Sequence, residues 1–190
     1  LSPHPDDIEY GMLGTIMKYK NTKFDIVVLS QGGDFDESTA KERQNECKKV
    51  WEHIDNINGC FIKDSKFIKD KDEDEWVNLL ENKFDISSYD CIITTSPTDS
   101  HFEHRMVNHI SYALIRGVDV GLVTYRTPST LEEWIPNYYV RIMDEVLQSK
   151  VDLLREGFES QKDKLYFQEQ SIKDFHTNYL CSKVGAGYVE

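Results

Sequence analysis

Short apolar runs alternate along the chain with longer segments in which apolar residues recur every three or four positions. The runs at 24–30 and 90–95 are rich in β-branched residues, which is typical of buried strands. The segment at 144–158 repeats its apolar residues with the period of an amphipathic helix. Strands that alternate with helices predict a mostly parallel sheet covered on both faces. We therefore expect a Rossmann-like, three-layer α/β/α fold.

The predicted elements follow one another closely. Strands are expected at 24–30, 60–62, 90–95 and 120–125, with an extended segment at 138–142. Helices are expected at 8–20, 39–54, 73–84, 104–116, 144–158 and 169–180. Thr39 and Glu42 make a capping-box pattern that predicts the start of the second helix. Gly11 and Gly14 leave room for the first helix to pack closely on the sheet.

The length of 190 residues fits a single domain, 1–190, which we interpret as truncated at both ends. Leu1 and Ser2 are interpreted as the end of a buried strand that begins before this sequence. The four cysteines are scattered and include no C-x-x-C pair. We therefore expect free thiols and a cytoplasmic protein.

The charge of the chain narrows the class of partner. With 34 acidic and 22 basic side chains, the formal net charge is −12. Nucleic-acid binding needs a concentrated basic surface, and the sequence shows none. No apolar run approaches the roughly 18 residues that a membrane span requires. We expect a small-molecule substrate, and self-association into a homo-oligomer is left open.

The densest group of chemically active side chains lies at the start of the chain, where His4, Asp6 and Asp7 stand within four positions. Pro3 and Pro5 exclude a regular helix or a central strand there. His4 and Asp7 supply ligand types that suit a divalent ion such as zinc. Asp6 is placed to take a proton from a water beside such an ion. Taken alone, the same string could also be a polar turn that caps a helix.

A second polar group follows the strand predicted at 90–95 and contains His101 and His104. In parallel α/β folds, ligands gather where strands end and loops turn into helices. His104 with His4 and Asp7 would make three protein ligands and leave a position open for water. An open position is what distinguishes catalytic from structural zinc sites.

Contacts to a substrate are predicted from the same edge of the sheet. The candidates are Gly32, Gly33, Arg43 and Asp99. The glycines and Asp99 lie in loops that follow predicted strands. Arg43 could meet a carboxylate or phosphate, or it could be a plain surface charge. The remaining histidines, His53, His109 and His176, are interpreted as ordinary surface or core residues.

Together these motifs resemble those of the LmbE-like, or PIG-L, family of metal-dependent deacetylases. The resemblance rests on His4-Pro5-Asp6-Asp7-x-Glu9, followed by Gly11 and Gly14, and on Asp99-x-His101-x-Glu103-His104-Arg105. It continues through Gly32-Gly33, Arg43-x-x-Glu46, Pro128-Ser129-Thr130, the run 136–140, Lys150, Ser160-Gln161 and the run 185–190. The family includes N-acetylglucosaminyl-phosphatidylinositol de-N-acetylases and the deacetylases of mycothiol and bacillithiol synthesis.

The resemblance implies that His4, Asp7 and His104 bind zinc, with ferrous iron as the alternative metal. Asp6 would be the general base, and His101 would stabilise or protonate the tetrahedral intermediate. The implied reaction removes the N-acetyl group from an N-acetylglucosamine-type amino-sugar conjugate. A metal-bound water would attack the amide carbonyl, and acetate would be released.

Three positions depart from the pattern of the family. Phe102 stands where proline is common, and Glu103 stands where aspartate is common. Asp99 occupies a position where some members carry a tyrosine that is thought to polarise the substrate carbonyl. That role of the tyrosine is in doubt for this chain. Glu103 is expected to orient His101 through a hydrogen bond.

Three other functions are compatible with parts of the sequence. The same metal site could hydrolyse another small amide or an ester. Gly32 and Gly33 could belong to a nucleotide-binding enzyme, but the Gly-x-Gly-x-x-Gly spacing is absent. The protein could also be a binding module that keeps the ligands without turnover. Metal analysis followed by an amine-release assay on N-acetylglucosamine separates these functions.

Overall fold

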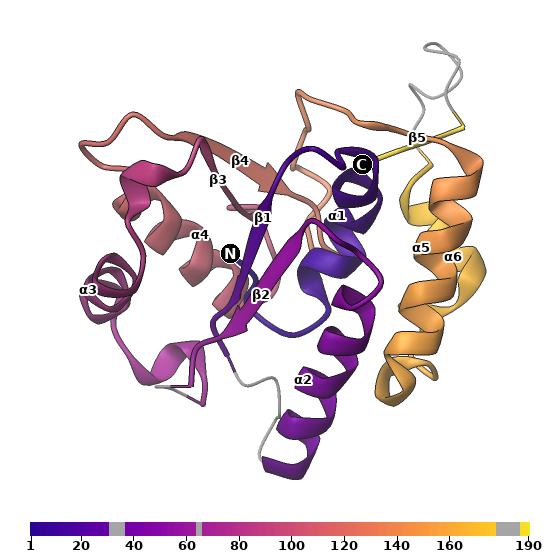
Figure 1. The fold of residues 1–190 in the computed structure, drawn as a ribbon, viewed down its shortest axis with the longest axis horizontal. Helices are drawn as coiled ribbons and strands as arrows, with labels where there is room; N and C mark the ends of the chain where they lie inside the picture. Colours follow the sequence, from indigo (N-terminus) through magenta and orange to yellow (C-terminus); the bar gives the residue numbers. More distant parts are fainter. Residues whose placement is uncertain (31–36, 64–65, 178–186) are drawn as a thin grey trace.

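The computed structural model describes residues 1–30, 37–63, 66–177 and 187–190, and its fold is a mixed α/β fold (Figure 1). Strand β1 (Phe24–Val28) pairs in parallel with β2 (Ile57–Phe61). Strand β3 (Cys91–Thr95) pairs in parallel with β4 (Gly121–Tyr125). A short antiparallel pair joins β5 (Arg141–Ile142) to β6 (Tyr188–Val189). The parallel pairs agree with the predicted α/β class.

The first two residues of the chain lie between the two parallel pairs. Ser2 forms a parallel bridge with Val28, the last residue of β1. The amino group of Leu1 donates a hydrogen bond to the carbonyl oxygen of Ile93 in β3 at 2.5 Å. Ser2 is therefore paired with β1, as expected for a residue at the end of a strand. The loop that follows them leaves near the C-terminal end of β1.

Helices lie on both sides of these strands. The α-helices of the described residues are α1 (Asp7–Lys18), α2 (Glu37–Trp51), α3 (Glu73–Lys83), α4 (Phe102–Leu114), α5 (Asp144–Gly157) and α6 (Glu169–Phe175). Short 3₁₀ helices are η1 (Ile68–Asp70), η2 (Ile86–Ser88), η3 (Glu159–Gln161) and η4 (Leu165–Phe167). In Figure 1, α3 and α4 lie on one side of the strands, and α1, α2, α5 and α6 lie on the other.

The side chains of β1 divide between two apolar clusters. Ile26 and Val28 pack in a cluster with residues of α1, α2 and α5. Val27 and Leu29 pack in a second cluster with residues of α3 and α4. Successive side chains of a strand point to opposite faces, so β1 is covered on both. This burial explains the continuous apolar run at 26–29, which follows the exposed Asp25.

Helix α1 packs closely at two glycines. A Cβ atom at Gly11 would lie 2.5 Å from Cδ2 of Tyr125 and 2.7 Å from the carbonyl oxygen of Arg126. A Cβ atom at Gly14 would lie 2.8 Å from Oε1 of Glu190. The predicted close packing is confirmed, and it fixes the start of α1 relative to the end of β4.

Several predicted helix boundaries are wrong by two or more residues, among them those of α2 and α6. Among the described residues, α2 covers Glu37–Trp51, so Thr39 lies inside the helix and the helix ends before the predicted residue 54. The last helix ends at Phe175 rather than at residue 180. It ends there because the chain turns at His176, whose carbonyl oxygen accepts a hydrogen bond from the backbone N–H of Val189 at 2.9 Å. Residues 178–180 lie outside the described residues.

Two further expectations can be compared with the described residues. Cys47, Cys60 and Cys91 are free thiols, as predicted, and Cys181 lies outside the described part of the chain. None of the described helices combines the length and apolar character that a bilayer crossing requires.

Candidate functional site

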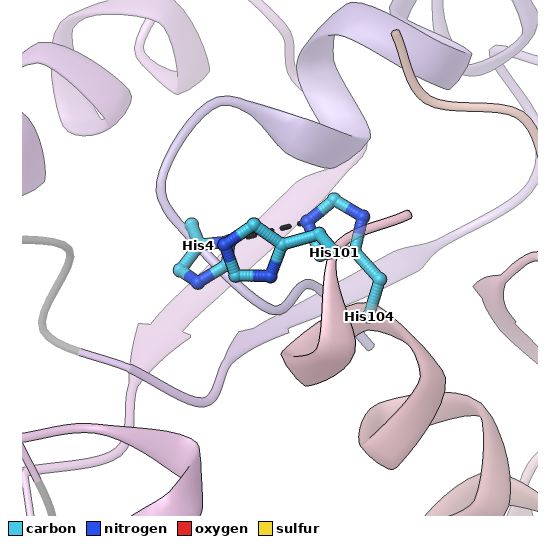
Figure 2. Close-up of side chains that lie close together, drawn as sticks. All are labelled: His4, His101 and His104. Carbon is cyan, nitrogen blue, oxygen red and sulfur yellow. Dashed lines mark hydrogen bonds between the residues drawn. The ribbon is translucent and has the colours of Figure 1, made fainter. Parts of the chain in front are cut away.

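The predicted site lies where two loops enter helices. The first loop carries His4 and Asp6 and leads from the Ser2 bridge into α1. The second loop leads from the end of β3 into α4, which carries His104. Both loops leave parallel strands at the same edge, so the three histidines His4, His101 and His104 lie together (Figure 2).

Three donor atoms form a nearly equilateral triangle. Nδ1 of His4 lies 3.0 Å from Oδ2 of Asp7, and that oxygen lies 3.2 Å from Nε2 of His104. The two ring nitrogens lie 3.3 Å apart. Tetrahedral ligands at about 2.0–2.1 Å from a zinc ion are about 3.3–3.4 Å from one another. The donor set therefore has the spacing and chemistry that suit a divalent metal ion.

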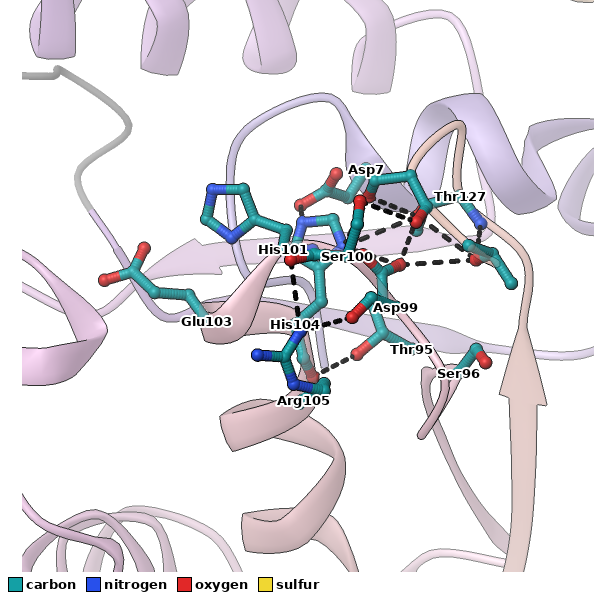
Figure 3. A network of polar contacts seen from close by, with 12 residues as sticks. Asp7, Thr95, Ser96, Asp99, Ser100, His101, Glu103, His104, Arg105 and Thr127 are labelled. Atoms are coloured by element: carbon teal, nitrogen blue, oxygen red, sulfur yellow. Dashed lines mark hydrogen bonds and ion pairs between the residues drawn. The ribbon is translucent and has the colours of Figure 1, made fainter. Parts of the chain in front are cut away.

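In both His4 and His104, the ring nitrogen outside the donor triangle contacts a carboxylate. Nε2 of His4 lies 2.8 Å from Oε2 of Glu103. Nδ1 of His104 lies 3.1 Å from Oδ2 of Asp99, and the Thr127 hydroxyl donates to that same oxygen at 2.7 Å (Figure 3). Such contacts orient the rings of metal-binding histidines and raise their basicity.

The same carboxylates make the cluster attractive to a cation. Burial acts to lower the pKa of His4, but hydrogen bonds to Asp7 and Glu103 raise it to about 9. Burial also acts to lower the pKa of His104, but Asp7 and Asp99 raise it to about 10. The negative potential that holds protons on both rings would also favour a divalent ion, and ion binding would release those protons.

His101 lies beside the donor triangle and is partly exposed. Its ring centroid is 4.8 Å from those of His4 and His104. The ligand nitrogens of the three histidines lie within 4.8 Å of one another, so these rings could also hold a metal ion. Burial, followed by the charges of His4 and His104, lowers the pKa of His101. Glu103 bonds to His4 rather than to His101, which corrects the predicted pairing.

Asp6 is held in an unusual backbone conformation. Its φ of 109° lies in the left-handed region, which non-glycine residues rarely adopt. Its backbone N–H donates to Oε2 of Glu9 at 3.2 Å, and Trp51 donates to Oε1 of Glu9 at 2.6 Å. Arg43 donates to Oδ2 of Asp6 at 2.9 Å and to the carbonyl oxygen of Pro5 at 2.7 Å. Burial raises the pKa of Asp6, and Arg43 opposes that shift.

The predicted substrate contacts stay predictions, and the structure shows the partners of two of these residues. Arg43 is paired with Asp6, because α2 directs its guanidinium toward the first loop. Asp99 is buried, with 1% of its surface exposed, and its carboxylate bonds to His104 and Thr127. Both residues therefore support other site residues. Gly32 and Gly33 lie outside the described residues.

The supporting roles of Glu9, Trp51 and Thr127 were not predicted, although Glu9 belongs to the first motif. Glu9 stands three positions after Asp6, and this capping-box spacing is a local signal that could have identified it. Trp51 and Thr127 carry no comparable signal. Their contacts with Glu9 and Asp99 depend on how α2 and the loop after β4 pack against the site.

Comparison with known proteins gives one family and several similar folds. Residues 1–115 match the family model described as PIG-L: GlcNAc-PI de-N-acetylase. The fold is similar to that of the conserved protein TT1542 from Thermus thermophilus, with a TM-score of 0.75, 18% identity, and coverage of 100% of this chain and 90% of that chain. No curated protein sequence matches the chain.

Two solved deacetylases share the fold. One is the N,N′-diacetylchitobiose deacetylase from Pyrococcus horikoshii, with a TM-score of 0.68, 20% identity, and coverage of 100% of this chain and 79% of that chain. The other is a teicoplanin deacetylase in its zinc-inhibited form, with a TM-score of 0.72, 12% identity, and coverage of 100% of this chain and 94% of that chain. At these identities the structural likeness shows the fold.

Proposed function

The chain belongs to the PIG-L family and is a deacetylase, and we propose that it removes the N-acetyl group from an N-acetylglucosamine-type conjugate and releases acetate. One observation carries the proposal. The donor triangle of His4, Asp7 and His104 lies beside a buried carboxylate, Asp6, and a partly exposed imidazole, His101. This combination supplies metal ligands, a base and an acid at one edge of the strands.

The proposed metal is zinc, held by His4, Asp7 and His104. One carboxylate and two imidazoles suit zinc, and ferrous iron is the alternative, since it accepts the same ligand types. When bound, the ion would polarise the amide carbonyl and lower the pKa of a water molecule.

Asp6 is the proposed general base. Its carboxylate pairs with Arg43, and it interacts through its charge with both Asp7 and His4 of the donor triangle. Arg43 and Glu9 hold Asp6 through its side chain and its backbone. A base held in one orientation can take the proton of the attacking water without first reorganising.

His101 is the proposed acid and oxyanion stabiliser. Its ring lies next to those of His4 and His104, yet its pKa is lowered while theirs are raised. A lowered pKa makes the protonated ring a stronger acid toward the departing amine. The backbone N–H of His101 donates to Oδ1 of Asp99, and the other oxygen of that carboxylate contacts His104.

A direct experiment tests this function. Purified protein is analysed for metal, reloaded with zinc or ferrous iron, and incubated with N-acetylglucosamine and N,N′-diacetylchitobiose. Stoichiometric release of amine and acetate is the expected result. If no sugar releases amine while an ester or a non-sugar amide is hydrolysed, the substrate class is wrong and the metal-dependent hydrolase remains.

The fold supports a further proposal, namely that the two parallel pairs belong to one sheet in a Rossmann-like, three-layer arrangement. Leu1 and Ser2 contact both β1 and β3, which would join the two pairs. The clusters on the two faces of β1 would be the interfaces between the sheet and its two helical layers.

A further inference from the structure

The ring of His101 is held differently from the rings of His4 and His104. In each of those two histidines, both ring nitrogens contact another side chain of the site. The backbone N–H of His101 donates to Asp99 at 2.8 Å, but its ring makes no hydrogen bond to any residue that the structure describes. The ring can therefore turn about its side-chain bonds without breaking a hydrogen bond to those residues.

Contacts with other rings keep His101 beside the donor triangle. Its ring stacks on that of His104, with centroids 4.8 Å apart and an angle of 29° between the planes. It also stacks on Phe102, at 5.7 Å and 10°. Both distances are within the range of about 4.5–7 Å for ring pairs. Phe102 is 45% exposed and stands where the family pattern has proline, which offers no aromatic ring for this contact.

The distances bring a nitrogen of His101 close to the position of a fourth metal ligand. Ligand nitrogens of His4, His101 and His104 lie within 4.8 Å of one another (Figure 2). Tetrahedral ligands of zinc are about 3.3–3.4 Å apart. The difference of at most about 1.5 Å is within the movement that a rotation of the side chain gives. With Asp7, the set would contain three imidazoles and one carboxylate, which are ligand types that zinc accepts.

We propose that His101 is an exchangeable fourth ligand, which closes the metal site when no substrate is bound, and that Phe102 is a positioning residue that favours this closed state. The inference rests on the metal site of the proposed function and adds a resting state to it. Metal-binding histidines are usually oriented by a carboxylate. His101 has none among the described residues, so a water molecule or a substrate can displace it. Only after it leaves can its ring donate a proton to the amine.

Azide binding to cobalt-loaded protein tests the exchangeable ligand. Cobalt(II) accepts the ligands that zinc accepts, and its visible absorption changes with them. In wild-type protein, azide must displace His101 to reach the fourth position. If about 90% of the molecules are closed, the His101→Ala variant should bind azide roughly tenfold more tightly. Its visible spectrum before azide is added should also differ from that of the wild type.

The direction of the change distinguishes this role from a simple contact with a bound anion. If the ring only donated a hydrogen bond to azide, its removal would weaken azide binding. Weaker or unchanged binding in His101→Ala would therefore overturn the exchangeable ligand. The exposed His109 lies on the same helix, and His109→Ala should keep the spectrum and the azide affinity of the wild type.

A second variant keeps the imidazole and removes only its stacking partner. Phe102→Ala should bind azide with an affinity between those of wild-type protein and His101→Ala, because the closed state loses the ring contact. An affinity equal to that of the wild type would overturn the positioning role of Phe102.

These titrations need no substrate, so their result is separate from that of the proposed function. If both variants bind azide more tightly although no sugar is deacetylated, the closed state stands and the proposed function fails. If sugars are deacetylated while the spectra and azide affinities of the variants equal those of the wild type, the exchangeable ligand is wrong and the proposed function stands.

Discussion

Two adjacent carboxylates at the start of α1 occupy different environments. Oδ2 of Asp7 faces a ring nitrogen of both His4 and His104, within 3.2 Å of each. Asp6 faces Arg43 instead. Pairs of titratable groups in contrasting surroundings are how active sites divide their tasks. At the residue scale, this contrast supports the proposed division of roles, in which Asp7 binds the metal and Asp6 transfers the proton.

Replacing Asp6 with asparagine tests the proton-transfer role. Asp6→Asn keeps the size of the side chain but removes the base, so kcat should fall on the order of a hundred- to ten-thousandfold. Metal content should stay at the wild-type level, because the three donor atoms are unchanged. A variant that loses its metal together with its activity would show that Asp6 supports the ligands instead.

Removing the charge of Asp99 tests its contact with His104. Asp99→Asn weakens the acceptor for Nδ1 of His104, so zinc affinity should fall roughly ten- to a hundredfold. Competition with a chelator measures this affinity. The exposed Asp119 is the control, since Asp119→Asn removes the same charge away from the site. Equal affinities for both variants would contradict a role for Asp99 in holding His104.

At the scale of elements, helix α2 supports the first loop. Arg43 contacts Asp6 directly, and Trp51, eight positions further along α2, contacts it through Glu9. Glu9 is fully buried, and burial raises its pKa to about 7. The left-handed backbone of Asp6 is thus held from its side chain and from its N–H. Strained residues persist at functional sites when their surroundings hold them in this way.

Replacing Trp51 with phenylalanine tests this support. Trp51→Phe keeps an aromatic ring but leaves Oε1 of Glu9 without its donor, which should lower the free energy of unfolding by about 1–3 kcal/mol. Because Glu9 also holds Asp6, kcat for a neutral sugar should fall as well. Urea unfolding and steady-state kinetics measure the two effects.

Trp76 offers a matched control for that variant. Its indole donates to the carbonyl oxygen of Ile68 at 2.7 Å, and its side chain is fully buried. Trp76→Phe should lower stability by a similar amount while keeping kcat for the neutral sugar. If both variants lose kcat equally, the effect comes from general destabilisation and α2 has no specific role.

At the scale of the whole molecule, the last residues of the chain tie α1 to α5. The Glu190 carboxylate accepts hydrogen bonds from the backbone of Gly14 at 3.0 Å and from the ammonium group of Lys150. His176 packs beside this pair, with its Nδ1 3.3 Å from the carbonyl oxygen of Val189. Burial, followed by the charge of Lys150, lowers the pKa of His176 well below its ordinary value of 6.5.

This lowered pKa predicts a loss of stability in mild acid. As the pH falls below about 6.5, the unfolded chain binds a proton at residue 176 and the folded protein does not. The free energy of unfolding should therefore decrease by up to about 1.4 kcal/mol per pH unit from this group alone. The His176→Gln variant lacks this group, so its free energy of unfolding should fall less steeply as the pH is lowered.

Urea unfolding between pH 7 and pH 5 measures that slope. The exposed His109 is the control, and His109→Gln should leave the slope as in the wild type. A slope that is the same in all three proteins would show that His176 takes up its proton in the folded state, which would contradict its burial as a neutral ring.

The order and type of the main elements could be read from the chain, because they depend on local patterns. The apolar run of β1 and the periodic segment of α5 lie where predicted. The ends of α2 and α6 were not predicted correctly. Helix ends depend on where the chain next finds hydrogen-bond partners, and His176 finds its partner in Val189, 13 positions away.

For the site, the sequence by itself determined the chemical types: two imidazoles, two adjacent carboxylates and the loops that carry them. These follow from composition and spacing within a few positions. Only the tertiary structure decided which carboxylate meets which ring. Glu103 bonds to His4, 99 positions away, rather than to His101, two positions away. Arg43 likewise turns to Asp6. Such pairs depend on how α1, α2 and α4 pack together, because side-chain direction is set by the packed helices and not by distance along the chain.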